Sequence, residues 1–104
     1  MNHLFKIITI SFIVFGCNGK FDKTQAAANL IIEALHRYKQ DHGFFPEKLP
    51  DVAPSYLEKI PKSAYDDREF IYEKSGDSYQ LIYLGALGGE ATYHSTSKAW
   101  TYDD

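Results

Sequence analysis

The sequence predicts an α+β domain in which one long helix packs on a small antiparallel sheet of about four strands. Two periodicities support this fold class. Apolar residues recur three and four positions apart over residues 22–42, which is the spacing of one helix face. From residue 69 onward the pattern changes to an alternation with period two, which is typical of strands. All four prolines lie between the two regions, so no long regular element is expected there.

The first 16 residues have the pattern of a removable targeting segment. An apolar run at residues 7–15 follows Lys6, the only charged residue of this segment. The run is much shorter than the roughly 20 residues that a membrane-spanning helix needs. Gly16 then precedes Cys17, the only cysteine of the chain, and polar residues follow. This stretch resembles the end of a bacterial lipoprotein signal peptide, in which the cysteine becomes the lipidated first residue of the mature protein.

That resemblance implies a division of the chain into three parts. Residues 1–16 are the signal peptide, residues 17–21 a short tether, and residues 22–104 the folded domain. Cys17 would carry diacylglycerol and a fatty acyl chain, and would hold the protein at a membrane of the bacterial cell envelope. Asn18 is not an aspartate, so the resemblance favours the periplasmic face of the outer membrane over the inner membrane.

Composition narrows the function classes further. A single cysteine excludes a disulfide within the chain. The net charge is −3 and no basic cluster occurs, so nucleic acid is not expected as a partner.

The helix is expected to begin at Asp22, because Asp22 and Gln25 have the spacing of an N-terminal capping box. Gly43 is the expected stop, since glycine accepts the left-handed conformation that follows a helix end. The predicted buried face consists of Ala27, Leu30, Ile31, Ala34, Leu35 and Tyr38.

The proline-containing segment, residues 44–62, is predicted to be a loop fixed by apolar side chains. Pro54 is expected to open a single helical turn that runs through Leu57. The side chains expected to fix the loop are Phe44, Phe45, Leu49, Val52, Tyr56, Leu57 and Ile60.

Four strands follow in the predicted order. Residues 69–74 and 78–84 form a hairpin around a turn at residues 75–77, and residues 85–90 form a glycine-rich loop. Residues 91–95 and 99–102 form a second hairpin around residues 96–98. In the second strand, Tyr79, Leu81 and Tyr83 are expected to share one face, and Gln80, Ile82 and Leu84 the other.

Three ordered motifs now resemble a single family. They are YKQDHGFFP at residues 38–46, FIY at residues 70–72 and YQLIYLGALG at residues 79–88. They resemble the helix end, the first strand, and the strand and loop of the major pseudopilin of type II secretion, which belongs to the type IV pilin-like superfamily. The resemblance covers roughly residues 30–100 and implies a pilin-like head domain.

The chain departs from that family at its N-terminus. In pilin-like subunits the long apolar helix follows the processing site, whereas here the apolar run precedes Gly16 and polar residues follow Cys17. The resemblance therefore implies a head without the helix that packs such subunits into a filament.

We expect no cofactor, although the resemblance leaves calcium open, because that family binds calcium in the loop after its Gly-Ala-Asp-Gly motif. Here Leu87 replaces the aspartate of that motif, and Glu90 is the only carboxylate of the loop. Asp103 and Asp104 are the other candidate ligands. Calcium usually takes six to eight oxygen ligands with several carboxylates.

No grouping of residues predicts catalysis or a metal site. His36 and His42 point about 120° apart on a regular helix, so they cannot share one metal ion. His94 stands near Ser95 and Ser97, but these serines belong to no nucleophile motif and are expected to be turn residues.

The most distinctive candidate surface is aromatic. Tyr83, Tyr93, Trp100 and Tyr102 come from neighbouring predicted strands and would form a platform for a protein partner or a glycan. The alternative is that they fill the core and scatter over the surface.

We therefore expect a lipid-anchored, non-enzymatic envelope protein with a pseudopilin-like head that contacts an envelope protein through its aromatic strands or its glycine-rich loop. The first alternative is a pseudopilin subunit of a type II secretion or type IV pilus filament. The second is a small hydrolase or metal-dependent enzyme.

Overall fold

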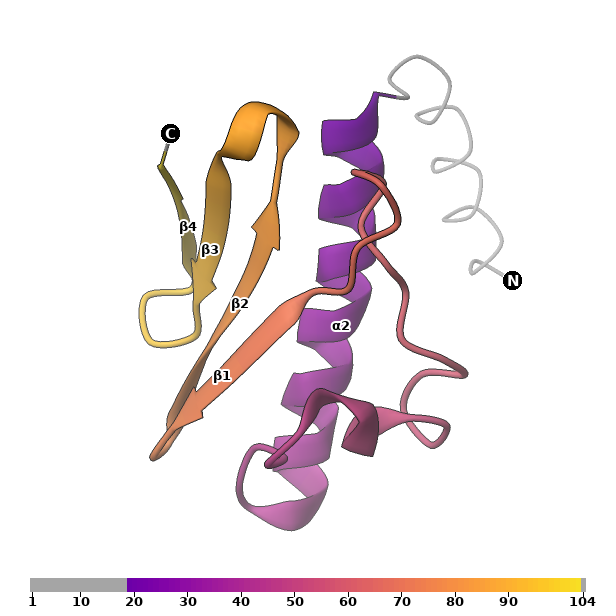
Figure 1. The fold of residues 1–104 in the computed structure, drawn as a ribbon. Helices are drawn as coiled ribbons and strands as arrows, with labels where there is room; N and C mark the ends of the chain where they lie inside the picture. Colours follow the sequence, from indigo (N-terminus) through magenta and orange to yellow (C-terminus); the bar gives the residue numbers. More distant parts are fainter. Residues whose placement is uncertain (1–18, 104) are drawn as a thin grey trace, which may run out of the picture.

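The computed structural model describes residues 19–103, so the predictions for Cys17, for the signal peptide and for Asp104 fall outside the described residues. The described part is one helix packed against one sheet, and this confirms the α+β prediction (Figure 1). The elements in chain order are α2 (Lys20–His42), η1 (Leu49–Val52), β1 (Ile71–Ser75), β2 (Ser78–Leu84), η2 (Ala86–Gly88), β3 (Glu90–His94) and β4 (Ala99–Asp103).

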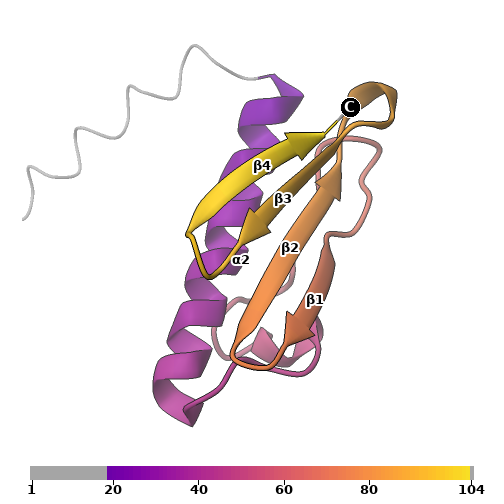
Figure 2. The same ribbon diagram turned by 90° about the vertical axis from the view of Figure 1, so that its left-hand side faces the viewer.

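The sheet is antiparallel throughout and has the strand order β1-β2-β3-β4. Helix α2 covers one face of it, as Figure 2 shows with the sheet in front of the helix. The predicted bounds of β2 are confirmed, and β1, β3 and β4 differ from prediction by one or two residues at their ends.

Helix α2 begins earlier than the sequence predicts. Its N-cap is Gly19, and no side chain caps it, so the predicted capping box at Asp22 is wrong. Gln25 instead donates its side-chain amide to the Tyr83 hydroxyl, 2.9 Å away across the interface with the sheet. This hydrogen bond to the sheet takes the place of the predicted capping bond between Gln25 and the start of the helix. Lys20 and Phe21, predicted to belong to the tether, are therefore part of the helix.

The end of α2 is as predicted. Gly43 has φ 89°, in the left-handed region, and its N–H donates to the Lys39 carbonyl oxygen at 2.7 Å. A residue with a Cβ would be strained at this φ.

The buried face of α2 is rotated slightly from the predicted one. Thr24, Ala28, Ile31, Ala34 and Leu35 are buried, whereas Leu30 is 52% exposed, so its assignment to the core is wrong. The apolar pattern does not predict the burial of Thr24, because threonine is a polar residue. Its buried hydroxyl accepts a hydrogen bond from the Ala64 N–H at 2.9 Å, which allows the burial.

Alternating residues of β2 build the opposite wall of the core. Tyr79, Leu81 and Tyr83 face α2 and are buried, as the period of two predicts. The cluster of buried core residues consists of Ala28, Ile31, Ala34, Leu35, Phe45, Leu49, Val52, Phe70, Tyr79, Leu81, Tyr83 and Ala91.

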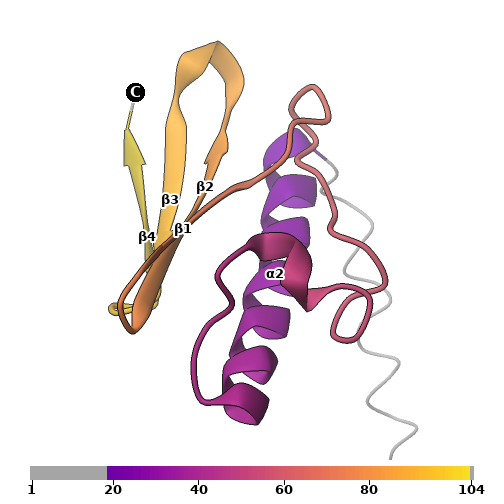
Figure 3. The ribbon, with the colours of Figure 1, turned by 60° about the horizontal axis from the view of Figure 1, so that its bottom comes forward.

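The connection from α2 to β1 runs beside the helix and contributes to the same core (Figure 3). Phe45 packs edge-to-face on Tyr79 at 4.8 Å, and the Tyr72 hydroxyl donates to the Pro46 carbonyl oxygen at 2.6 Å. Two predictions for this segment are wrong. Pro54 does not open a helical turn but lies in a turn, and the short helix of this segment is η1, which contains Pro50. Phe44 does not fix the loop in the core, because it is 53% exposed.

Two leucines of α2 provide a matched test of the core. Leu35→Ala should lower the free energy of unfolding by about 2–5 kcal/mol, because it leaves a cavity in a fully buried site. Leu30→Ala, the same change on the exposed side of the helix, should cost less than about 0.5 kcal/mol. Urea unfolding followed by circular dichroism measures both. Equal losses for the two variants would contradict this assignment of the helix face.

Candidate functional site

The four aromatic residues predicted to form a platform lie together on the face of the sheet that points toward α2. Tyr93 of β3 is the register partner of Trp100 of β4. The Trp100 ring centroid lies 5.5 Å from those of Tyr83 and Tyr93, and 6.3 Å from that of Tyr102. The structure therefore brings the four side chains into one row.

Their exposure increases along that row toward the edge of the sheet. Tyr83 is 2% exposed and belongs to the core, so the prediction that it contributes to an exposed platform is wrong. Burial raises the pKa of the Tyr83 and Tyr93 hydroxyls above the ordinary tyrosine value. Tyr93 and Trp100 are half-buried, and Tyr102 is 57% exposed. The helix covers the β2 end of the row and leaves the β4 end open.

Two residues of α2 that the sequence pattern does not predict at this site complete the row. Gln25 donates to the Tyr83 hydroxyl at 2.9 Å and lies 3.5 Å from the Tyr102 hydroxyl. Phe21 is 47% exposed, and its ring centroid lies 6.3 Å from that of Tyr102. The sequence predicts Phe21 in the tether and Gln25 in an N-terminal capping box, so neither is expected to contact the sheet. The spacing of Phe21, Gln25 and Ala28, at i, i+4 and i+7, is the signal that could have placed them on the helix face.

The start of α2, the β2–β3 connection and the end of β4 lie at the same end of the molecule (Figures 1 and 2). A hollow of about 130 Å³ lies between them, lined by residues that include Phe21, Gly85, Gly89 and Tyr102. Leu87, in the middle of the β2–β3 connection, is fully exposed. We call Phe21, Leu87 and Tyr102 the apical surface.

The β2–β3 connection holds Leu87 in an unusual conformation. The Gly85 N–H donates to the Gly89 carbonyl oxygen at 2.8 Å and closes the loop. Leu87 has φ 58° and ψ 26°, in the left-handed region that bulky residues rarely adopt. The fold thus presents an apolar side chain to solvent in a strained backbone position.

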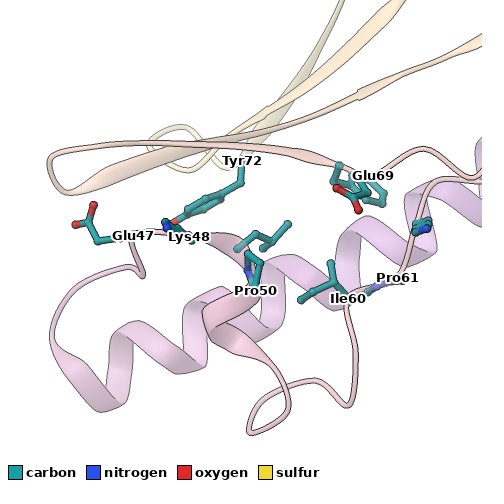
Figure 4. A pocket seen from close by; sticks show the side chains of 10 residues that line it. Glu47, Lys48, Pro50, Ile60, Pro61, Glu69 and Tyr72 are labelled. Carbon is teal, nitrogen blue, oxygen red and sulfur yellow. The ribbon is translucent and has the colours of Figure 1, made fainter.

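A second hollow, of about 410 Å³, lies between η1 and β1 (Figure 4). Its walls are mainly apolar, with Pro50, Ile60 and Tyr72 facing the hollow, and Glu47 and Glu69 among its charged residues. The Tyr72 hydroxyl already donates to the Pro46 carbonyl oxygen, and Glu47 pairs with Lys74 at 2.8 Å. These two bonds engage Tyr72 and Glu47, two of the polar side chains that line the hollow.

Two candidate catalytic residues, His94 and Ser95, bond to neighbouring strands, and the candidate metal ligand His42 contacts its own helix. Nε2 of His94 lies 2.9 Å from the Thr101 hydroxyl, and the Ser95 hydroxyl accepts from the Tyr79 N–H at 2.8 Å. His42 stacks on Tyr38 with ring centroids 3.9 Å apart. These contacts support structural roles for the three side chains.

The candidate calcium ligands are only partly assembled. Glu90 and Asp103 face each other in the β3–β4 register. Across residues 19–103, no group of three or more His, Cys, Asp or Glu side chains could hold a metal ion.

Between Gly19 and Asp103, no helix combines the length and the apolar character needed to cross a membrane. No known protein family, no curated protein and no solved structure matches this chain.

Buried tyrosines should make the fold sensitive to alkaline pH. Burial raises the pKa of Tyr79 and Tyr72 well above the ordinary value of about 10. The folded state therefore holds these protons more tightly than the unfolded state. The stability contribution is complete below about pH 10 and is lost as pH rises beyond it. Melting temperatures measured from pH 8 to pH 12 should show this fall.

The variant Tyr79→Phe should reduce that fall, because it removes one of the buried ionisable hydroxyls. Tyr102→Phe, at an exposed site, serves as the matched control and should leave the fall unchanged. Identical curves for the wild type and Tyr79→Phe would rule out a contribution from Tyr79.

The strained position of Leu87 should be relieved by asparagine, which tolerates the left-handed region better. Leu87→Asn should raise the free energy of unfolding by about 0.5–1 kcal/mol, or a few degrees in melting temperature. Leu30→Asn, another exposed leucine changed in the same way but in a helix, should lower it by about 0.5 kcal/mol. A loss of stability in both variants would show that Leu87 makes packing contacts.

Proposed function

We propose that this chain is a lipid-anchored, non-enzymatic protein of the bacterial cell envelope whose pilin-like head contacts an envelope protein. The residues around Gly16 and Cys17 support the anchor, since they resemble a lipoprotein processing site. The arrangement of one helix on four antiparallel strands is compatible with a pilin-like head at the level of fold class. Cys17 is the lipidation site of this proposal.

One observation carries the proposal furthest, and it is where the helix begins. Gly19 is the N-cap of α2, only two positions after Cys17. The first turn of α2 contains Lys20, Asp22 and Lys23, so the helix starts with charged residues. In a filament subunit the apolar run would follow the processing site and lead into this helix, whereas here the run at residues 7–15 precedes Gly16. A charged helix start beside the anchor favours a tethered head over a filament subunit.

The lipid would supply the membrane attachment. Each methylene buried in the bilayer contributes about 0.8 kcal/mol, so several acyl chains give durable anchoring. The head would then stay at the periplasmic face of the envelope membrane, with the outer membrane favoured by Asn18.

For the partner contact, the free edge of β4 is the best-supported region. Among residues 19–103, β4 pairs with β3 alone, so its other side carries backbone groups that can pair with a strand of another protein. Half-buried Tyr93 and Trp100 lie directly beside this edge and offer aromatic contact area. Tyr83 is excluded by its burial, and we assign Tyr102 separately below.

The anchor is tested by intact mass of the membrane-extracted protein. We expect loss of residues 1–16 and the added mass of diacylglycerol and one fatty acyl chain on Cys17. The variant Cys17→Ala should carry no lipid and should retain residues 1–16, because the modification site is absent.

A second form of the protein completes this test. In this form a cleavable export signal that is not lipidated replaces residues 1–16, and alanine replaces Cys17. In detergent phase partitioning, the head should then move from the detergent phase to the aqueous phase. An unlipidated wild-type protein that keeps residues 7–15 would refute the anchor and favour the filament alternative.

A further inference from the structure

We propose that the apical surface docks on the lipid bilayer that holds the anchor, with Leu87 reaching the boundary of the acyl chains. This inference rests on the proposed lipidation of Cys17. It assigns Phe21, Leu87 and Tyr102 to a lipid surface and not to a protein partner. The argument has four parts: the reach of the tether, the chemistry at this end of the head, the conformation of Leu87 and the local charge.

The tether is too short to hold the head away from the membrane. Three peptide units separate Cys17 from Lys20, the first residue of α2. Fully extended, they reach at most about 11 Å. The start of α2 must therefore lie within that distance of the Cα atom of Cys17, whose side chain carries the lipid, and so close to the headgroups. The β2–β3 connection and the end of β4 lie at the same end of the head (Figures 1 and 2).

Exposed apolar side chains are concentrated at this end. Within residues 19–103, six large hydrophobic residues are exposed, and three of them form the apical surface. The other three, Leu30, Phe44 and Ile71, come from the middle of α2, its far end and β1. Tyrosine is enriched at membrane interfaces, which accommodate both its apolar ring and its hydroxyl. Phenylalanine and leucine are typical of the apolar faces that enter this region.

Leu87 is the strongest single indication. It is fully exposed, and it lies in a left-handed conformation that disfavours a branched aliphatic side chain. The hydrogen bond from Gly85 to Gly89 fixes the loop that presents it. Neither packing nor backbone preference accounts for a leucine here, whereas insertion into an apolar boundary does.

Charge at this end shows what kind of lipid contact to expect. Lys20 and Lys23 are exposed at the helix start, but Asp22, Glu90 and Asp103 are exposed close by. The acids outnumber the lysines. Attraction to anionic lipids therefore cannot drive docking, and the apolar side chains must do so. Docking should be about as strong on zwitterionic as on anionic membranes.

The test uses the full-length lipidated protein in phosphatidylcholine vesicles whose acyl chains carry bromine as a contact quencher. Cys17 is the only native cysteine and is blocked by lipid, so an introduced cysteine is the only free thiol. A fluorophore is attached at Leu87→Cys or, as the matched control, at Phe44→Cys beyond the far end of α2. We expect at least twofold quenching at position 87 and none at position 44.

A second variant tests the role of the leucine. With the fluorophore at Tyr102→Cys, adding Leu87→Asp should reduce quenching at least twofold, because a carboxylate opposes insertion. Aspartate tolerates the left-handed conformation, so the head should remain folded. Vesicles that contain phosphatidylglycerol should give the same quenching within twofold.

Several outcomes would overturn the inference. Equal quenching at positions 87 and 44, or no effect of Leu87→Asp, would show that the apical surface does not dock on the membrane. Quenching only in phosphatidylglycerol vesicles would mean electrostatic docking. A spectral shift without bromine quenching that grows with protein density would assign the surface to a second copy. Intact mass separates these from failure of the anchor, since an unlipidated protein refutes the proposed function first.

Discussion

The reversal of the chain at Gly43 is the constraint on which the rest of the head depends. The left-handed turn lets the segment after α2 return along the helix, so that Phe45 reaches Tyr79 and Pro46 reaches Tyr72. These contacts join the connecting loop to the first two strands, in the core to which α2 also contributes. The loop is also tied back to the helix end, because the Tyr56 hydroxyl donates to Asp41 at 2.6 Å.

The elements with strong local signals could be predicted from the sequence. Gly43 marked the helix end, and the alternation of β2 marked both its bounds and its buried face. The misassigned residues depend on contacts distant in sequence. Thr24 is buried because Ala64 satisfies its hydroxyl, and Gln25 bonds to Tyr83 across the interface. Neither partner can be identified from the helix sequence alone, and the local pattern instead predicts Leu30 in the core and Asp22 at the cap.

Only part of the candidate site could be predicted from the sequence, because the rest again depends on contacts distant in sequence. The sequence predicts that Tyr93, Trp100 and Tyr102 come from neighbouring strands, but it does not say which face of the sheet the helix covers or how far the cover extends. That extent decides function, since it separates buried Tyr83 from exposed Tyr102. From the sequence, Leu87 is distinctive only because it replaces the aspartate of the Gly-Ala-Asp-Gly motif. Its exposure and left-handed backbone belong to the folded loop and have no counterpart in sequence periodicity.

Trp100 has a spectroscopic consequence. It is the only tryptophan of the chain, and it sits on the last strand among three tyrosine rings at 5.5–6.3 Å. Tyrosine excitation should pass to it efficiently at such distances, so its emission reports the attachment of β4 to β3. An edge strand held by one neighbour opens at lower free energy than the core. Fluorescence and helix circular dichroism should therefore follow different events, the first at the sheet edge and the second in α2.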